Sequence, residues 1–156
     1  MITIKKATLE NLNTIQQLGF ELLQFERDRW DPTLDLSWPK SESGRAMYEN
    51  AILNKYTIIA YLDDTAVGYL IGTIQVPPEG SARSNITAQL NNIYVNESAR
   101  HTGVGHALAA NFSQYCTENH VVNINVTVNA ANTGAIAFYE HEGFMSSRLI
   151  MTQKLE

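Results

Sequence analysis

The sequence predicts a single α/β domain built on one mixed, mostly antiparallel sheet with about four flanking helices. Residues 56–62 and 66–76 are β-rich runs separated by a short turn, which indicates an antiparallel hairpin. Residues 87–95 and 121–128 are also β-rich, and a helical segment at 103–119 lies between them. Because parallel strands need a crossover of this kind, the second pair is predicted to be parallel.

The first third of the chain predicts a strand and two helices. Residues 2–7 alternate apolar and polar side chains, as a half-buried strand does. Thr8 can cap the amphipathic helix that follows, whose apolar positions recur at spacings of three and four. These positions are Leu9, Leu12, Ile15, Leu18, Leu22 and Phe25. The pattern stops over residues 26–41, an irregular stretch of a length that is usually functional or mobile, and a second helix is predicted over 42–54.

The remaining segments complete one domain that spans residues 1–156. Gly68, inside the second run of the hairpin, indicates a bulge or a close backbone approach. Residues 77–85 read as a loop, and a short helix is predicted over 133–141. A final β-rich segment is expected over 144–154.

Composition narrows the function classes. A net charge of −5 over 156 residues argues against nucleic acid or an anionic membrane as the main partner. No apolar run approaches the ~20 residues that span a bilayer, and the first ten residues lack the apolar block of a signal peptide, so a cytoplasmic location is expected. Cys116 is the single cysteine, which excludes a disulfide framework, and its helical setting favours a small buried hydrophobe over a nucleophile.

A glycine-containing loop joins the first strand of the parallel pair to the crossover helix. Gly103 and Gly105 open that helix, and without Cβ atoms they leave backbone N–H groups uncovered beside the positive end of the helix dipole. Such groups favour an anion such as a pyrophosphate, and Arg100 adds a positive charge. The competing interpretation is an ordinary turn between a strand and a helix.

Two better-known phosphate loops do not fit these residues. A Walker A loop needs Lys followed by Ser or Thr after its last glycine, whereas His106 and Ala107 follow Gly105. The dinucleotide pattern G-x-G-x-x-G requires Gly or Ala at the position of Leu108.

A second constellation lies in the segment VNAANTGAIAFYEHEGF at 128–144. Asn132 and Tyr139 are seven residues apart, so they share one face if both are helical. By themselves, Asn132 could simply cap the helix and Tyr139 could be a half-buried aromatic.

Together the two regions resemble the GNAT superfamily of N-acetyltransferases. The cofactor loop of that family has the pattern Q/R-x-x-G-x-G/A, which Arg100, Gly103 and Gly105 match. Its later motif is N-x-x-A-x-x-x-Y with G-F shortly after. The matching residues are Asn132, Ala135, Tyr139, Gly143 and Phe144.

The resemblance implies a GNAT-like fold in which the two central parallel strands splay apart and hold the pantetheine arm of acetyl-CoA, the co-substrate, in the gap. It implies backbone contacts to that arm and to the thioester from the strand, and to the pyrophosphate from the loop. These positions are Ile93, Tyr94 and Val95 on the strand and Arg100, His101, Thr102, Gly103, Val104, Gly105 and His106 in the loop. Asn132 would hydrogen-bond the pantetheine, and Tyr139 would face the sulfur. No metal is expected, because the four histidines lack a ligand-spaced pair.

The implied reaction is direct attack of an amine on the thioester, with Tyr139 assisting departure of the thiolate. Many relatives place a glutamate on the strand before the cofactor loop, but this chain has Gln89, Leu90, Asn91 and Asn92 there. The general base is therefore left open. The alternatives are a carboxylate acting through water, from Glu26, Asp28 or Asp31, or a water chain held by Asn91 or Asn92.

The first helix and the irregular stretch after it carry an excess of acids. The acids are Glu21, Glu26, Asp28, Asp31, Asp35 and Glu42, against Arg27, Arg29 and Lys40. Beside Trp30 and Trp38, such a surface could receive a cationic amine by charge and cation–π contact, and a solvated acidic face is the alternative. A small cationic amine is therefore the favoured acceptor, whether polyamine, amino-sugar, amino acid or protein amine.

Two functions other than an enzyme are also compatible with the sequence. One is a non-catalytic acyl-CoA-binding or sensing module, because the usual acid is missing. The other is a protein-interaction domain in which the glycine loop is only a turn. The expected partners are acetyl-CoA and an amine acceptor, without nucleic acid or membrane, and a homodimer is compatible with the sequence.

Overall fold

The computed structural model describes residues 1–155, and its strands form one five-stranded sheet in the order β1-β2-β3-β4-β5. The strands are β1 (Ile2–Lys6), β2 (Tyr56–Leu62), β3 (Thr65–Gln75), β4 (Thr87–Val95) and β5 (Asn123–Val126). Strands β1 to β4 pair antiparallel in sequence, whereas β4 and β5 pair parallel. The predicted mixed, mostly antiparallel sheet is confirmed.

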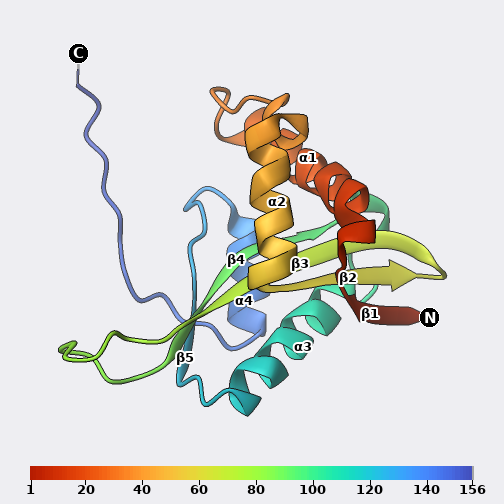
Figure 1. Cartoon of the computed structure of the whole chain (residues 1–156). Helices are drawn as coiled ribbons and strands as arrows, with labels where there is room; N and C mark the ends of the chain where they lie inside the picture. The colour runs from red at the N-terminus through yellow and green to blue at the C-terminus, as the bar shows by residue number, and fades with distance from the viewer. Residues whose placement is uncertain (156) are drawn as a thin grey trace.

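Four α-helices cover the two faces of this sheet. They are α1 (Leu12–Arg29), α2 (Glu42–Asn54), α3 (Val104–Glu118) and α4 (Thr133–His141). Helices α1 and α2 lie together on one face, and α3 crosses the other face, where it contacts β1 to β4 (Figure 1). Within residues 1–155, no helix is both long and apolar enough to cross a membrane.

The connection between α1 and α2 is more ordered than the sequence pattern predicts. Helix α1 continues to Arg29, so the irregular stretch is shortened to residues 30–41, and it contains a 3₁₀ turn, η2 (Trp38–Lys40). The buried Gln16 amide donates a 2.9 Å hydrogen bond to the Pro39 carbonyl and so fastens this turn to α1. Ser41 then caps α2 by accepting a 3.1 Å hydrogen bond from the Gly44 N–H.

The sheet separates two hydrophobic clusters. The cluster on the α3 side includes Ile58, Leu70, Leu90, Leu108, Phe112 and Cys116, and the cluster on the α1–α2 side includes Ile15, Leu18, Ile52, Ile59, Tyr69 and Tyr94. Gly72 has no Cβ where the Phe112 ring lies, since a Cβ there would come within 2.2 Å of the ring. Burial raises the pKa of the Cys116 thiol to about 11, which agrees with its predicted role as a small hydrophobe rather than a nucleophile.

Gly68 allows β3 to approach β4 closely, as the sequence indicates. A Cβ at Gly68 would lie 2.6 Å from the carbonyl oxygen of Tyr94. The register of β2 and β3 also shifts next to it, because Ala60 pairs with Gly68 whereas Tyr61 pairs with Ala66. Both features that the sequence suggested for this glycine are therefore present.

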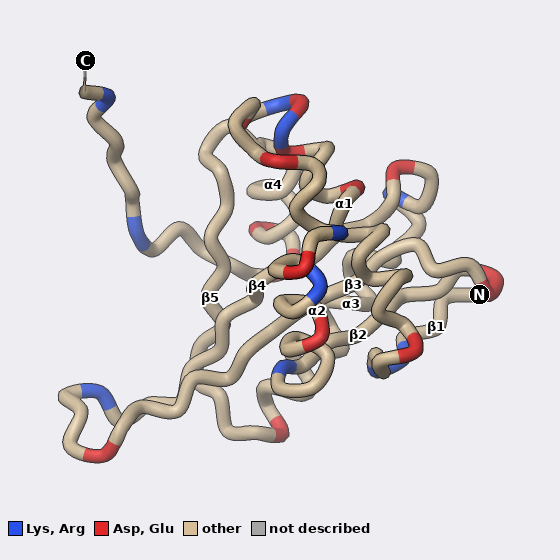
Figure 2. Tube along the Cα trace, turned by 45° about the horizontal axis from the view of Figure 1, so that its top comes forward, with Lys and Arg blue, Asp and Glu red and all other residues tan. Residues whose placement is uncertain are grey.

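The predicted final β segment at 144–154 is wrong for this structure. Residues after α4 run away from the body of the molecule as a single extended segment and form no strand with other described residues (Figure 1). From 145 to 155 this segment carries two basic residues and no acidic one (Figure 2). The β-rich composition indicates a preference for extended backbone, but a strand also needs a neighbouring edge with which to pair.

Candidate active site

Strands β4 and β5 are paired over only part of their length. The parallel ladder joins Thr87–Leu90 to Asn123–Val126, where β5 ends. Strand β4 continues to Val95, so its second half has no strand beside it on the β5 side. This opening is the splay that the sequence resemblance implies.

A β-bulge lies where the opening begins. Ile71 pairs with Asn92 and Gly72 pairs with Leu90, so Asn91 is an extra residue in β4. The Thr73 hydroxyl donates a 2.6 Å hydrogen bond to Asn91 Oδ1, which fixes the bulged side chain. Bulges bend a strand and increase its twist, and this bulge directly follows Leu90, the last residue of β4 that pairs with β5.

Alternation along β4 decides which backbone groups face the opening. The Asn96 N–H donates to the Val67 carbonyl on the β3 side, with a length of 2.7 Å. Because peptide groups point alternately to the two sides of a strand, Val95 and Ile93 direct their N–H and C=O groups into the opening. Tyr94 directs its backbone toward β3, and its side chain lies on the α1 side of the sheet.

The loop after β4 leads to the uncapped start of α3. It contains the 3₁₀ turn η3 (Glu97–Ala99) and two residues with positive φ, His101 at 61° and Gly103 at 92°. Gly103 is the N-cap residue of α3 and supplies no side-chain cap. The first-turn N–H groups of an α-helix have no acceptor within the helix, so they are available to an anion.

The two glycines of the loop have different structural roles. Gly103 needs its positive φ, which residues with a Cβ adopt with strain. Gly105 allows close contact with α4, since a Cβ there would lie 3.2 Å from Cε2 of Phe138. Thr102 closes the turn by donating from Oγ1 to the Ala99 carbonyl at 2.6 Å.

Arg100 and His106 flank this loop and are held by other residues. Arg100 Nε donates to the Val95 carbonyl at 3.1 Å, and its guanidinium lies 4.6 Å from the centre of the Phe25 ring. His106 Nδ1 lies 3.0 Å from the carboxylate of Glu142, which joins the start of α3 to the end of α4. Both side chains are therefore placed at the edges of the loop.

Asn132 and Tyr139 occupy the two ends of α4. Asn132 caps the helix, because its Oδ1 accepts a 3.0 Å hydrogen bond from the Ala135 N–H. Tyr139 is 9% exposed and packs edge-on against Phe138 and Phe144. Burial raises the pKa of Tyr139 to about 12, and the charge of Glu26 contributes in the same direction.

Glu26 and Tyr139 lie over opposite faces of the sheet. Tyr139 belongs to the cluster on the α3 side, whereas Glu26 is on α1 over the other face. The charge of Glu26 contributes to the raised pKa of Tyr139. This is consistent with the opening beyond Leu90, where β4 has no strand beside it. Burial, followed by the charge of Asp31, raises the pKa of Glu26.

The other acids of this region are solvated or hydrogen-bonded. Hydrogen bonds from Thr33 lower the pKa of Asp31, and hydrogen bonds from Ser37 lower the pKa of Asp35. Glu42 lies in the first turn of α2. Asp31 and Asp35 are thus hydrogen-bonded within their own stretch, and neither of them lines the cavity between α1 and β4.

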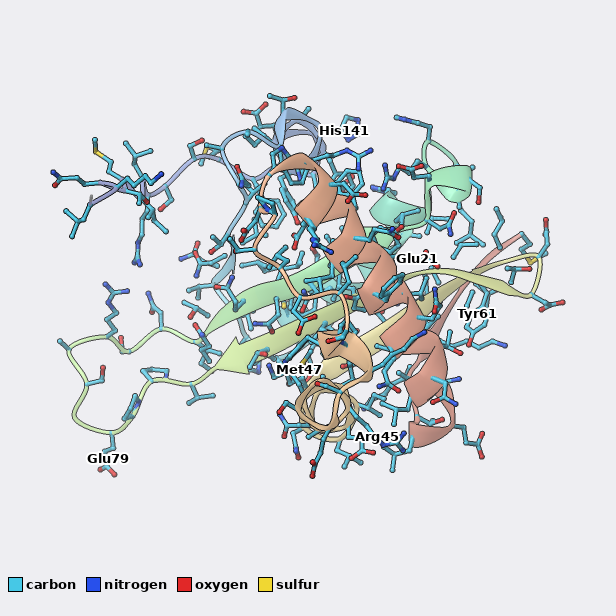
Figure 3. The ribbon with its side chains drawn as sticks, turned by 90° about the horizontal axis from the view of Figure 1, so that it is seen from above. Glu21, Arg45, Met47, Tyr61, Glu79 and His141 are labelled. Atoms are coloured by element: carbon cyan, nitrogen blue, oxygen red, sulfur yellow. The ribbon has the colours of Figure 1, made fainter. Side chains whose placement is uncertain are left out.

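A cavity of about 290 Å³ lies between α1 and the end of β4. Its lining residues are Glu21, Gln24, Phe25, Asp28, Arg29, Tyr94, Asn96 and Glu97. Figure 3 shows Glu21 on α1 where that helix crosses the strands. Asn96 donates a 3.1 Å hydrogen bond to Glu21, so the two walls of the cavity are joined.

Some residues that line the cavity were not predicted from the sequence, and some that were predicted to meet the acceptor do not line it. Asn96 and Glu97 follow β4 and meet α1 only through tertiary contacts, for which the sequence has no local signal. Trp38 packs against Tyr48 of α2, with ring centres 6.3 Å apart, and does not line the cavity. Trp30 packs on Phe25, which does line it.

Comparison with known proteins shows the family to which this chain belongs and the fold that it shares with solved structures. The profile of the acetyltransferase (GNAT) family matches residues 21–144, which is most of the chain. Among curated proteins, none matches this sequence significantly.

Several solved structures are similar over nearly the whole chain. A tetramutant of the BH1408 protein from Bacillus halodurans has a TM-score of 0.87 at 16% identity, with 98% of this chain and 99% of that chain covered. The aminoglycoside N-acetyltransferase AAC(6')-Iy in complex with CoA has a TM-score of 0.75 at 20% identity, with 99% and 95% covered. The aminoglycoside acetyltransferase meta-AAC0020, from an uncultured soil metagenomic sample and in complex with sisomicin, has a TM-score of 0.71 at 18% identity, with 99% and 97% covered.

Proposed function

Because this chain belongs to the acetyltransferase (GNAT) family, we propose that it transfers the acetyl group of acetyl-CoA to a primary amine, with a small cationic amine favoured. The observation that carries the proposal is the opening beside β4. Its wall is the unpaired half of that strand, and the uncapped start of α3 follows it in the chain. Tyr139 belongs to the hydrophobic cluster against which Ile93 and Val95 of this half-strand pack.

The opening suits the extended cofactor. Ile93 would hydrogen-bond the pantetheine arm through its backbone, and Val95 through its N–H, because the Val95 carbonyl already accepts from Arg100. Asn132 uses its side-chain oxygen as a cap and would offer its amide N–H groups to the same arm. Tyr94 would contribute through its side chain in the cavity.

The pyrophosphate would lie at the start of α3. The backbone N–H groups of His101, Thr102, Gly103, Val104, Gly105 and His106 would hold it, with the helix dipole adding to the attraction. Arg100 would act from the edge of the loop, where it also positions the end of β4.

In the reaction the amine nitrogen attacks the thioester carbon, the C–S bond breaks and the CoA thiolate departs. The pKa of Tyr139 is about 12, whereas the pKa of a thiol is ~8.5. Because of this difference, complete proton transfer from the tyrosine to the thiolate would cost ~5 kcal/mol. We therefore assign Tyr139 a hydrogen bond to the departing thiolate, whose final proton comes from solvent.

We propose Glu26 as the base for the proton that the amine loses. An alkyl ammonium of pKa ~10.4 is almost fully charged at neutral pH, so the site must remove a proton before or during attack. Glu26 is half-buried with a raised pKa, which makes it a stronger base than Asp31, whose carboxylate is exposed and hydrogen-bonded. Glu26 does not line the cavity, so it would act through water, and the contribution of its charge to the raised pKa of Tyr139 supports this choice over Asp31.

The cavity supports a cationic acceptor. Three carboxylates, from Glu21, Asp28 and Glu97, outnumber the single lining cation, Arg29. The aromatic ring of Phe25 lies among them. Two of the similar structures are aminoglycoside acetyltransferases, one of them in complex with sisomicin, which supports an amine of that class as the acceptor here.

Thiol release from acetyl-CoA, measured against a panel of amines, tests the proposal. The panel contains polyamines, amino-sugars, amino acids and lysine peptides, together with neutral amines. We expect turnover with at least one cationic amine. Tight acetyl-CoA binding by calorimetry without turnover on any amine would favour the acyl-CoA-sensing module instead, and no binding would contradict both functions.

A further inference from the structure

We infer that a second cavity, formed by α1, η2 and α2, binds a small organic acid that carries two carboxylates and one hydroxyl or ammonium group. This inference does not depend on the proposed function.

The second cavity has a volume of about 390 Å³. Pockets that bind small molecules begin at about 300 Å³, so the space is sufficient for an acid of a few carbon atoms. The lining residues are Asn13, Gln16, Gln17, Lys40 and Arg45, and none of them lines the cavity between α1 and the end of β4. The second cavity is therefore a separate site.

Three elements bring these side chains together. Asn13, Gln16 and Gln17 lie on the first half of α1, and Asn13 and Gln17 are one turn apart on the same side of the helix. Lys40 ends η2, a turn that the Gln16 amide holds against α1. Arg45 lies in the second turn of α2, beside the N-terminal half of α1 (Figure 3).

The second cavity is cationic in a protein that is acidic as a whole. Lys40 and Arg45 provide two positive charges and none of the five lining side chains is acidic, whereas the chain has a net charge of −5. An anion is repelled by the molecule as a whole, so any binding must come from a local site such as this one.

Both cations are available to a ligand. Lys40 forms none of the ion pairs found within residues 1–155, and its ammonium lies 5.5 Å from the centre of the Phe20 ring. Arg45 pairs with Glu49 through Nε at 3.0 Å, and its guanidinium carries further N–H donors that suit a carboxylate. Two cations therefore favour a ligand with two carboxylates.

A buried glutamine adds a hydrogen-bond acceptor. Gln16 is 7% exposed, and its amide nitrogen donates to the Pro39 carbonyl. Its amide oxygen accepts no hydrogen bond from the described residues. No side-chain oxygen or nitrogen among those residues is both fully buried and unpartnered, so the Gln16 oxygen is open to the cavity that this side chain lines. Such an acceptor favours a ligand that also carries a hydroxyl or ammonium donor.

The exposed amides complete the set of donors. Gln17 uses one amide N–H for a 3.3 Å hydrogen bond to Glu21 and retains a second. Asn13 contributes another amide next to it. Carboxylate oxygens only accept hydrogen bonds, so these donors complement the same ligand as the two cations.

Calorimetry with L-malate and succinate tests the inference on the full chain. The two acids share both carboxylates, and malate adds one hydroxyl. We expect malate to bind about fivefold more tightly, because only malate can donate to the Gln16 oxygen. Equal affinities, or no malate binding at millimolar concentration, would overturn the inference. Inorganic phosphate that binds as tightly as malate would show a site for any oxyanion, and competition by acetyl-CoA would place malate in the opening beside β4; either result would also overturn it.

Two double variants with the same change of charge locate the binding. Lys40→Gln, Arg45→Gln removes both cations of the second cavity, and the Kd for malate should rise by about tenfold or more. The control is Lys6→Gln, Arg83→Gln, which removes the same charge outside the cavity and should keep the wild-type Kd. All four side chains are exposed, so both variants should unfold at the wild-type temperature. An unchanged Kd in the first variant, or an equal rise in both, would show that malate binds elsewhere and that the inference is wrong.

Discussion

Arg100 Nε donates a 3.1 Å hydrogen bond to the carbonyl oxygen of Val95, and this bond joins the loop before α3 to the end of β4. Val95 directs its backbone into the opening beside β4, so the arginine fixes one wall of the proposed pantetheine site. Its guanidinium also lies on Phe25, which lines the acidic cavity. One side chain thus connects the loop before α3, the strand and the acidic cavity.

Replacing Arg100 should weaken cofactor binding more than folding. Arg100→Met keeps the apolar stem over Phe25 but removes the Nε donor and the charge. We expect the Kd for acetyl-CoA to rise about tenfold, ~1.4 kcal/mol, and the free energy of unfolding to fall by about 1 kcal/mol. Calorimetry and urea unfolding measure the two effects. Arg100→Lys retains the charge without the planar donor, so an affinity equal to wild type in the Lys variant would assign the effect to charge alone.

Gly103 and Gly80 form a matched pair for testing the loop. Both have positive φ, 92° and 77°, and a Cβ at either would not clash. Alanine should cost each about 1–3 kcal/mol of backbone strain. We expect Gly103→Ala alone to weaken acetyl-CoA binding, because only Gly103 opens α3. Equal affinities in the two variants would remove the phosphate role of the loop. Gly105 is a poorer test, since its Cβ would also press on Phe138.

Glu26→Gln should lower kcat at neutral pH without changing acetyl-CoA affinity. Glu26 acts as a base only when deprotonated, and its pKa is raised above 4.5, so the wild-type kcat should fall as the pH falls through that raised value. The variant should lose this limb of the pH profile. Asp31→Asn is the control, because Asp31 is exposed and bonded to Thr33. It should keep this limb, displaced to lower pH, because the charge of Asp31 helps to raise the pKa of Glu26. An unchanged kcat in Glu26→Gln would show that Glu26 is not the base and would favour a water chain held by Asn91 or Asn92.

The cavity acids should control acceptor affinity. The double variant Glu21→Gln, Asp28→Asn removes two carboxylates that line the cavity, so KM for a cationic amine should rise by about tenfold or more and its dependence on salt should flatten. The control is Asp31→Asn, Asp35→Asn, which removes the same charge from residues outside the cavity. If both double variants raise KM equally, the attraction comes from the overall charge of the molecule and not from this cavity.

Local patterns were sufficient to predict most elements but not their tertiary relations. The bounds of α2, β4 and α4 agree with the residue patterns, because caps, alternation and helical spacing are local properties. The bulge at Asn91 depends on the register between β3 and β4, which no single strand encodes. Arg100 was expected simply to add charge to the loop, whereas its contacts with Val95 and Phe25 join segments far apart in sequence.

The C-terminal segment shows why a pattern can indicate a strand that the chain does not form. Residues 145–155 have the apolar and β-branched composition of a strand, but pairing requires an edge at the right place and distance. Similarly, the acids of residues 26–41 form a cluster in sequence, whereas Asp31 and Asp35 accept hydrogen bonds from Thr33 and Ser37 and Glu26 is half-buried with a raised pKa. Their separation depends on where α1 ends, which the sequence placed four residues too early.

Tyr139→Phe tests the chemical step. The variant keeps the ring that packs on Phe138 and Phe144 and removes only the hydroxyl. If Tyr139 stabilises the departing thiolate, kcat should fall on the order of 10²–10⁴-fold under conditions where chemistry limits the rate. Acetyl-CoA affinity should change little, because a thioester sulfur is a weak acceptor in the ground state.

The pH profile supplies an independent check on Tyr139. Its pKa is raised to about 12, so the hydroxyl stays protonated and able to donate up to about pH 11, and the wild-type kcat should not decline below that pH through this residue. Removing the negative charge in Glu26→Gln should lower the pKa of Tyr139, because that charge opposes formation of the phenolate. A wild-type kcat in Tyr139→Phe would show that the hydroxyl has no catalytic role and that the ring only packs in the core. Loss of acetyl-CoA binding in the folded variant would instead make Tyr139 a cofactor contact and assign thiolate stabilisation to the backbone N–H groups of β4.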